Sequence, residues 1–512
     1  MILTREIAAI AAAFGLFLLL APFGSSGPRR ARWLAGLAIA LASWVALATT
    51  LLPTADWRGL GDRLTPLGAV AGAAAVVGVT AGAIALGRAM VRRPWVWFLA
   101  LAIALPVRIP VPIGGDTSNL LVPLYGVIFV GLGVVTWEVL RGRFDATRGN
   151  LLTPVALPLA AFIAISLVST LWSVSSKEAT VKAVFFYIPF ALLTVLVIAW
   201  WPRARALETL AWTTAVGGGA VAILALAQYF AKAIFWNHRQ EQANAYGRFF
   251  RVNGIFFDPN ILGRFLVLSI VGALAYALWK RTPANLWAMG GLAGLSMAGM
   301  AVTFSRSSCL QLMVGVALLA ARAFRPRRVL AVGLCVALLG GIGAAVASHN
   351  VRRVATDGAY LARVSEGRYG LVKGGLKIWR EEPVIGVGLG SFETYFREQL
   401  TASERRKIRV VISHNTPITV LSELGLVGFG LFAVLAAWTG VWLRRRSRRR
   451  GAEGWAAWTA CAMLAGVFVH SLFYSGFFED PYVWVLAAGA VALVGSAPNA
   501  RAGSARTQDL DA

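Results

Sequence analysis

Apolar residues recur along the chain in runs of about 20, separated by short segments rich in Arg or Lys. A helix of about 20 apolar residues crosses a hydrocarbon core of about 30 Å, so each run predicts one membrane span. The span near 95–113 is interrupted by Pro106, Arg108, Pro110 and Pro112, which makes it the least regular of the set. The pattern predicts about fifteen spans, near 7–22, 33–52, 67–87, 95–113, 119–140, 153–174, 180–201, 207–231, 261–279, 285–304, 308–323, 329–348, 415–443, 455–475 and 481–496.

Basic residues gather in every second loop between these spans, which predicts the orientation of the protein. Cytoplasmic loops carry an excess of Lys and Arg, so the basic loops are expected to face the cytoplasm, followed by a disordered cytoplasmic tail at 497–512. The two longest loops, 232–260 and 349–414, then lie on the outer face. The basic positions are Arg29, Arg30, Arg32, Arg88, Arg92, Arg93, Arg141, Arg143, Arg148, Arg203, Arg205, Lys280, Arg281, Arg322, Arg325, Arg327, Arg328 and Arg444–Arg450.

Composition supports the same class of protein. Of 512 residues, 58% are hydrophobic and 14% charged, against about 25% charged in soluble domains. A soluble enzyme, a secreted disulfide scaffold and a disordered chain are therefore excluded. The net charge of +26 is spread through short loops, which fits membrane topology better than a nucleic-acid surface. The three cysteines form no CxxC pair, so neither a zinc site nor a disulfide framework is indicated. The apolar N-terminus shows no clear cleavage site and is interpreted as a retained helix.

The loop at 349–414 contains an amphipathic segment. Its twelve Lys or Arg outnumber seven Asp or Glu, although basic residues on the outer face oppose the orientation rule. Two interpretations stay open: an interfacial helix on lipid head groups, or a solvated helix packed on the membrane domain. One helical face carries Tyr369, Val372, Leu376 and Trp379, and another carries Lys373, Lys377 and Arg380.

Two arginines on the outer face are candidates for binding an anion. Arg251 precedes the turn Asp258-Pro259-Asn260, in which Asn260 is the predicted helix N-cap. Arg306 lies in FSRSS, between two spans with almost no loop, where an arginine is costly unless it has a partner or faces a wet cavity. The simpler interpretations are a loop arginine on lipid phosphates for Arg251 and snorkelling to the interface for Arg306.

The segment 411–428 supplies a candidate for proton transfer. His414 stands at the start of a span on the outer side, and His is the side chain best suited to proton transfer near neutral pH. Capping or packing is the alternative role for this histidine, one of four with His238, His349 and His470. Glu423 is an acid inside an apolar helix and must be paired or solvated.

Missing motifs narrow the chemistry. The sequence contains no Asp-x-Asp in an outer loop, no HExxH, no P-loop and no GxSxG, so ATP-driven transport and zinc or serine hydrolysis are unsupported. We therefore expect a site without metal or cofactor, formed by arginines and one histidine. Arginines suit a diphosphate because the guanidinium fork pairs with its oxygens and offsets charge on the leaving group.

Taken together, these motifs resemble the O-antigen ligase and polymerase superfamily. The resemblance covers roughly 205–480 and rests on the order of Arg251 and DPN, Ser305-Arg306, the segment 367–392 (GRYGLVKGGLKIWREEPVIGVGLGSF), His414-Asn415 and Glu423-Leu424-Gly425. It implies a GT-C-type, metal-independent, inverting glycosyltransferase of the bacterial plasma membrane whose active site faces the periplasm or exterior. The implied partners are an undecaprenyl-diphosphate-linked glycan donor, a lipid- or glycan-linked acceptor and membrane lipids.

The resemblance also implies roles for single residues. Arg251 and Arg306 would bind the diphosphate, His414 would act as general base, and Arg368 is a lesser candidate for donor or acceptor binding. Asn260, Asn415 and Glu423 would support the site. Two positions depart from the family pattern: Asp258 replaces a frequent Asn, and Thr416-Pro417 replaces a bulkier continuation, which puts the acceptor preference in doubt.

The predicted fold class is an all-α polytopic membrane protein with a partly helical outer loop. Its GT-C-like core of about twelve spans would begin near residue 95, after about three additional N-terminal spans. The predicted division is 1–94, N-terminal spans; 95–348, first part of the core, with the outer loop 232–260; 349–414, outer loop; 415–496, C-terminal spans; and 497–512, tail.

Other functions remain open at this stage. The enzyme could be a ligase, a polymerase or a protein glycosyltransferase. A lipid-linked oligosaccharide transporter or flippase without covalent chemistry is the alternative from another class, although no clear internal repeat is seen and the ionisable residues gather on the outer face. A membrane acyltransferase using a buried histidine would leave the outer arginines without a role.

Overall fold

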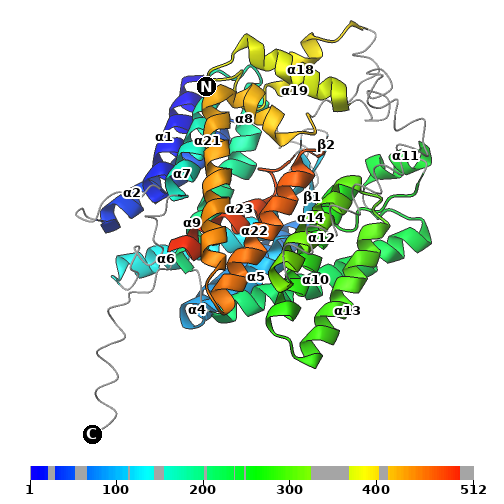
Figure 1. Cartoon of the computed structure of the whole chain (residues 1–512). Helices are drawn as coiled ribbons and strands as arrows, with labels where there is room; N and C mark the ends of the chain where they lie inside the picture. The colour runs from blue at the N-terminus through cyan, green and yellow to red at the C-terminus, as the bar shows by residue number, and fades with distance from the viewer. Residues whose placement is uncertain are drawn as a thin grey trace.

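The computed structural model of the chain describes residues 2–20, 29–51, 66–113, 116–142, 155–200, 204–235, 237–246, 249–324, 368–402, 413–474 and 476–495 (Figure 1). The first half contains α1 (Ile2–Leu20), α2 (Arg29–Thr49), α4 (Pro66–Arg92), α5 (Trp95–Ala104), β1 (Ile109–Ile113), β2 (Asp116–Leu120), α6 (Val122–Leu140), α7 (Ala156–Val168), η2 (Ser169–Leu171), α8 (Ser176–Lys182), η3 (Ala183–Tyr187), α9 (Ile188–Trp200) and α10 (Ala204–Ala231). The second half contains α11 (His238–Tyr246), α12 (Pro259–Trp279), α13 (Pro283–Ala301), α14 (Arg306–Ala323), α18 (Arg368–Glu381), α19 (Phe392–Glu398), α21 (Thr416–Ser447), α22 (Ala452–Ser471) and α23 (Pro481–Gly495).

The described chain is a bundle of apolar helices, as the hydrophobic pattern predicts. Eight helical segments are long and apolar enough to cross a membrane, so this is a multi-pass helical membrane protein. They are Leu3–Leu20, Arg30–Thr49, Val122–Leu140, Ser176–Ala199, Leu207–Ala231, Pro259–Trp279, Thr416–Ser447 and Ala452–Ser471. The predicted span at 329–348, like Cys335 within it, lies outside the described residues.

The predicted span at 95–113 is wrong. Helix α5 ends at Ala104, and the chain then forms an antiparallel hairpin in which β1 pairs with β2. Proline lacks the amide N–H that a helix needs and disfavours the helical conformation in the residue before it. Pro106, Pro110 and Pro112 therefore keep the helix from continuing to residue 113. Within the described residues, the predicted all-α fold differs from the structure by this one hairpin.

The N-terminal helices pack closely against the rest of the bundle. A Cβ added at Gly15 of α1 would lie 2.8 Å from the Gly36 carbonyl oxygen of α2, so these two helices meet backbone to backbone. Buried residues of α1 and α2 share one apolar cluster with α7, α9 and α21. The domain division at residue 94 stays a prediction, but α1 and α2 contribute to the same core.

Basic residues meet at one end of the bundle, which agrees with the predicted alternation of loops. The Lys280 ammonium after α12 lies 3.0 Å from the Glu208 carboxylate near the start of α10. Arg446 at the end of α21 lies 3.1 Å from Glu453 at the start of α22. The opposite end carries α18 and α19, seen at the top of Figure 1. We call it the site end, and which compartment it faces stays a prediction.

Candidate functional site

Arg251 is held at the start of α12 by a local network. Asp258 caps α12: its Oδ1 accepts the Asn260 amide at 2.6 Å, while Pro259 occupies the first helical position. The prediction that Asn260 is the N-cap is therefore wrong by two residues. The Asn260 side chain instead donates from Nδ2 to Asp258 Oδ1 at 2.8 Å, and its Oδ1 accepts Arg251 Nη2 at 3.1 Å. Arg251 also donates from Nε to the Thr303 carbonyl at 2.9 Å.

Thr303 belongs to the turn that leads into Arg306. Ser305 is the N-cap of α14, with its Oγ accepting the Ser308 amide at 3.3 Å, and Arg306 is the first helical residue. Phe304 has a positive φ of 51°, a conformation uncommon outside glycine, and its exposed ring stacks on Phe249 at 4.9 Å. The exposed Arg306 thus lies at a helix N-terminus, in the turn that Arg251 contacts.

His414 immediately precedes α21. Asn415 is the N-cap of that helix, and its Oδ1 accepts the Ile418 amide at 3.1 Å. The Asn415 side chain also donates from Nδ2 to the Leu472 carbonyl at 3.2 Å, which ties the start of α21 to the end of α22. His414 has a φ of 51° and is half-buried, with its ring 6.0 Å from the Tyr474 ring.

The structure adds two side chains to which the sequence assigned no role, His470 and Tyr474. His470 is fully buried at the end of α22, with Nε2 3.1 Å from Ser307 Oγ and its ring 5.7 Å from the Tyr474 ring. Burial, and next the negative charge of Asp258, raise the pKa of Tyr474 well above its ordinary value, so the hydroxyl stays protonated. A histidine at the end of an apolar helix, one turn before a tyrosine, was the available sequence signal.

Not every predicted site residue lies with Arg251, Arg306 and His414 at the site end. Five predicted residues lie together at the site end, although up to 164 positions separate them in the sequence: Arg251, Asn260, Arg306, His414 and Asn415. Arg368 is the first residue of α18, and its side chain lies outside the described part of the structure. Glu423 belongs to a separate network.

Glu423 lies at a break in α21. Gly425 has φ 61° and ψ −163°, and the segment that follows α18 is bound across this break. The Gly388 amide donates to the Glu423 carbonyl at 2.9 Å and the Val427 amide to the Val384 carbonyl at 3.1 Å. The motif segments 383–388 and 423–425 are therefore one structural unit, and Gly425 is required because only glycine readily adopts this backbone conformation.

Replacing Gly425 by alanine is expected to destabilise this unit. An added Cβ would lie 2.3 Å from the Val384 carbonyl oxygen, so the bound segment must move, and backbone strain adds about 1–3 kcal/mol. Thermal unfolding in detergent checks this: the midpoint should fall for Gly425→Ala. Gly430→Ala is the matched control, since no atom lies within 4 Å of its Cβ and alanine favours a helix. Equal midpoints for the two variants would contradict the expectation.

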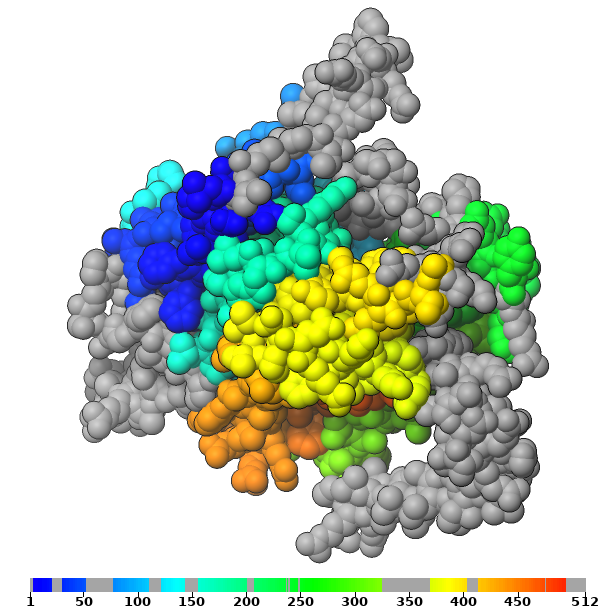
Figure 2. All heavy atoms as spheres, turned by 90° about the horizontal axis from the view of Figure 1, so that it is seen from above, coloured from blue at the N-terminus to red at the C-terminus, as the bar shows by residue number. Residues whose placement is uncertain are grey.

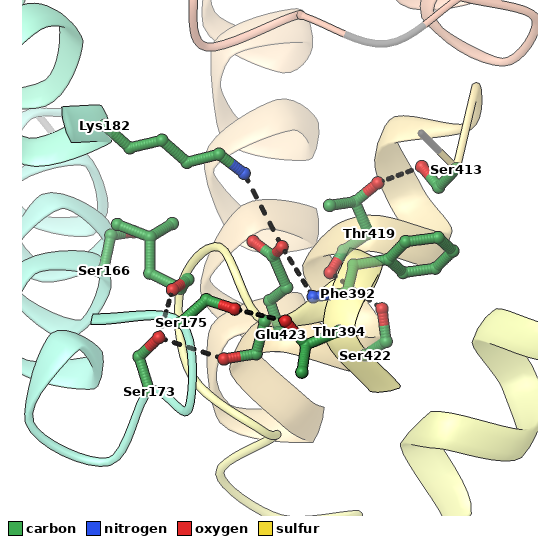
Figure 3. A network of polar contacts seen from close by, with 12 residues as sticks. Ser166, Ser173, Ser175, Lys182, Phe392, Thr394, Ser413, Thr419, Ser422 and Glu423 are labelled. Carbon is green, nitrogen blue, oxygen red and sulfur yellow. Dashed lines mark hydrogen bonds and ion pairs between the residues drawn. The ribbon is translucent and has the colours of Figure 1, made fainter. Parts of the chain in front are cut away.

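The Glu423 carboxylate is paired, as the sequence requires of an acid in an apolar helix. Its Oε1 lies 3.6 Å from Lys182 Nζ and accepts the Phe392 amide at 3.4 Å, so the pair joins α8, α19 and α21 (Figure 3). Nearby, Ser173 Oγ donates to the Leu389 carbonyl at 2.7 Å. These contacts hold α18 and α19 across the site end, beside residues 169–182 (Figure 2). Glu423 thus supports the fold around the site.

Removing only one charge of this pair should cost more stability than removing both. Lys182→Met leaves the buried Glu423 carboxylate without its partner, which is expected to cost roughly 3 kcal/mol. The double variant Lys182→Met/Glu423→Gln leaves no unpaired charge at this pair and should recover part of the loss. Unfolding midpoints of the four proteins in the cycle measure the coupling. A double variant less stable than Lys182→Met would refute the expectation that the unpaired Glu423 charge causes the loss.

The amphipathic segment forms α18, as predicted. Lys373, Lys377 and Arg380 are exposed. The face packed on the protein is formed by Gly374, Gly375 and Ile378, and Tyr369 in the aromatic and aliphatic row is 45% exposed. A Cβ at Gly374 would lie 2.3 Å from Phe396, so the glycines allow α18 to lie directly on α19. Helix packing on the membrane domain is thus the interpretation that these contacts support.

The described part of the chain contains no group of three or more His, Cys, Asp or Glu side chains that could hold a metal ion. Its polar site consists of arginines, histidines, hydroxyls and amides at one end of a helical membrane bundle. This defines the class: a multi-pass membrane protein with a polar site where α12, α14, α21 and α22 meet.

Comparison with known sequences finds a family resemblance for part of the chain. The O-antigen ligase family model matches residues 291–433, so the chain is similar to that family over this segment, and the predicted resemblance is confirmed. No curated protein matches the chain significantly. The matched segment includes Arg306, Arg368, His414, Asn415 and Glu423, whereas Arg251, Asn260 and the histidine and tyrosine at the end of α22 lie outside it.

Proposed function

We propose that the protein is a glycosyltransferase that moves a glycan from an undecaprenyl-diphosphate donor to an acceptor hydroxyl at the outer face of the bacterial plasma membrane. The O-antigen ligase match supports glycan transfer from a lipid-linked substrate. The single observation that carries the proposal is the convergence of Arg251, Arg306 and His414 at one end of the bundle, through the contacts of Thr303, Asn260 and Tyr474.

Arg251 and Arg306 are proposed to bind the diphosphate. Arg251 is preoriented by hydrogen bonds to Asn260 and to the Thr303 carbonyl, and Arg306 is exposed at the N-terminus of α14. A guanidinium and the partial positive charge of a helix N-terminus both favour phosphate oxygens. As the bond between the sugar and the diphosphate breaks, negative charge grows on the leaving oxygen, which these groups stabilise.

His414 is proposed as the general base. The acceptor oxygen would form a bond to the anomeric carbon, its proton would pass to His414, and the lipid diphosphate would leave with the bonding electrons. Attack opposite the leaving group inverts the anomeric centre, and the arginines supply the positive charge, without a metal ion. Of the two histidines at the site, His414 is half-buried, whereas His470 is fully buried against Ser307, which supports His414 as the group that meets an acceptor.

An apolar cavity supports a substrate with a long hydrocarbon tail. A space of about 180 Å³ lies between α10, α12, α22 and α23, lined almost entirely by apolar side chains. It includes Tyr482, whose amide donates to Asp480 at 2.9 Å, and Asp480 is paired with Arg264 at 2.7 Å. The lining runs from Trp279 and Ala452 at the basic end of the bundle to Leu268 and Tyr482, so the space would accept an apolar chain that extends into the bundle from the side of Tyr482.

Glycan transfer by the purified protein in nanodiscs tests this function. The protein receives an undecaprenyl-diphosphate oligosaccharide, candidate acceptors and EDTA, and products are resolved by size. Transfer in EDTA is expected, with a ladder for a polymerase and a single addition for a ligase. Movement of unchanged donor across the bilayer, without a new glycosidic bond for any acceptor, would overturn the proposal and favour a transporter.

A further inference from the structure

Exposed aromatic rings gather beside the arginines of the candidate site. The rings of Phe249 and Phe304 are stacked, with centroids 4.9 Å and planes 12° apart, although the two side chains are 52% and 39% exposed. The Tyr229 ring lies 6.3 Å from the Phe304 ring in a tilted arrangement. We call these three rings the aromatic platform. They come from the end of α10, from the segment before α12 and from the turn before α14.

Backbone strain accompanies the aromatic platform. Phe304 and Lys232 both have a φ of 51°, and in the described part of the chain only one other residue besides glycine has a positive φ. The Lys232 ammonium lies 3.7 Å from the centre of the Tyr229 ring and 5.3 Å from that of Phe250, which holds the Tyr229 ring in place. Strained residues persist only where their surroundings enforce them, and they gather at functional sites. Exposed rings held in this way indicate a surface for a ligand.

The aromatic platform adjoins the two arginines that are proposed to bind the diphosphate. Phe304 precedes Arg306 by two residues, and Phe249 precedes Arg251 by two residues. In a lipid-linked glycan the diphosphate lies between the hydrocarbon chain and the first sugar. A surface beside these arginines therefore meets either the hydrocarbon chain or the sugars.

The neighbouring helix α11 favours the sugars. Its sequence, HRQEQANAY, contains no run of apolar residues, and a helix with this composition is costly in hydrocarbon. Asn244 of α11 is bonded to both backbone groups of Arg251: the Arg251 amide donates to Asn244 Oδ1 at 3.0 Å, and Asn244 Nδ2 donates to the Arg251 carbonyl at 2.9 Å. The segment that carries Phe249 is thus tied to a helix suited to the polar layer, where the sugars of such a substrate lie.

We propose that the aromatic platform binds the sugar rings of the donor glycan that lie next to the diphosphate. A sugar ring presents C–H bonds on its apolar face, and their weakly positive hydrogens suit the negative face of an aromatic ring. Phe249 and Phe304 cover each other on one side only, so their exposed parts offer a flat apolar surface. The inference rests on the proposed function, because it names the part of the same substrate that meets this surface.

The test measures binding of two ligands to the protein in nanodiscs: an undecaprenyl-diphosphate oligosaccharide and undecaprenyl diphosphate without sugar. We expect Phe249→Leu, which keeps an apolar side chain but loses the ring, to raise the Kd of the oligosaccharide about 2- to 10-fold. The Kd of the ligand without sugar and the unfolding midpoint should not change. Phe249→Tyr, which keeps the ring, should bind both ligands as the wild type does.

Phe129→Leu is the matched control. Phe129 of α6 is 49% exposed and stacks on Trp44 at 5.1 Å, outside the aromatic platform, so this variant should bind both ligands as the wild type does. Equal weakening of both ligands by Phe249→Leu would mean that the ring contacts the lipid or the diphosphate, and would overturn the inference. Unchanged binding of the oligosaccharide would overturn it as well. Because binding is measured without transfer, a wild type that transfers no glycan would remove the proposed enzyme activity separately.

Discussion

Replacing His414 by alanine is expected to reduce the rate of glycan transfer by about 10²–10⁴-fold, the range that a positioned general base contributes. The imidazole stands directly before the N-cap Asn415, half-buried and beside Tyr474. Under the proposed function, its removal would deprive the acceptor hydroxyl of its proton acceptor, while the arginines proposed to bind the diphosphate would stay in place. The loss should therefore appear in kcat, with the donor KM changed little.

The measurement is steady-state transfer by wild type and His414→Ala in the same nanodiscs, with donor affinity determined separately. Because Asn415 still caps α21 in the variant, its unfolding midpoint is expected to match that of the wild type. Added imidazole should restore part of the rate if a proton acceptor is what the variant lacks. Transfer at the wild-type rate by a folded His414→Ala protein would eliminate His414 as the base.

Replacing Arg306 by alanine is the second large effect, with an expected fall of about 10²–10³-fold in kcat/KM. Arg306 is exposed at the first position of α14, so its truncation removes a charge from the site without emptying a packed core. Both ground-state binding of the diphosphate and stabilisation of the leaving group should weaken. Arg306→Lys keeps the charge but loses the planar fork, and should recover only part of the activity.

Arg322→Ala is the matched control, because Arg322 lies in the last turn of the same helix, at the opposite end of the bundle. Its guanidinium lies over the Trp455 ring at 5.6 Å, away from the site. Activity of this variant should stay within about twofold of wild type, consistent with a surface contact of small energy. A comparable loss in both variants would mean that charge anywhere on α14 matters, and Arg306 would lose its specific role.

Local sequence features predicted where helices begin at the candidate site but not the contacts between those helices. The capping residues are an example. The turn at 258–260 predicts the start of a helix, but not whether Asp258 or Asn260 is the N-cap. Pro259 occupies the first helical position, and this makes Asp258 the N-cap. The side chain freed from capping, Asn260, then binds Arg251 and Ser305, and neither contact can be read from spacing.

The contact between α14 and α22 shows the same division. Ser305 and Ser307 are unremarkable in an apolar context, and His470 is one histidine near a helix end. Their roles depend on α14 and α22 lying side by side, so that residues 163 positions apart come within 3.1 Å. Periodicity along one helix says which face is apolar, but not which helix will cover it, because the apolar faces of membrane helices are chemically alike.

The sequence by itself determined the class of protein, the positions of most spans, the alternation of basic loops and the residues that could carry chemistry. These follow from the length of apolar runs, from charge distribution and from side-chain chemistry, all of which act locally. Tertiary structure decided the break at Gly425, the hairpin at 109–120, and the contacts of Arg251 with Asn260 and of Ser307 with His470 at the site end. Each of these depends on contacts between segments far apart in the chain, where close backbone approach and hydrogen-bond geometry select one arrangement among many that the pattern alone allows.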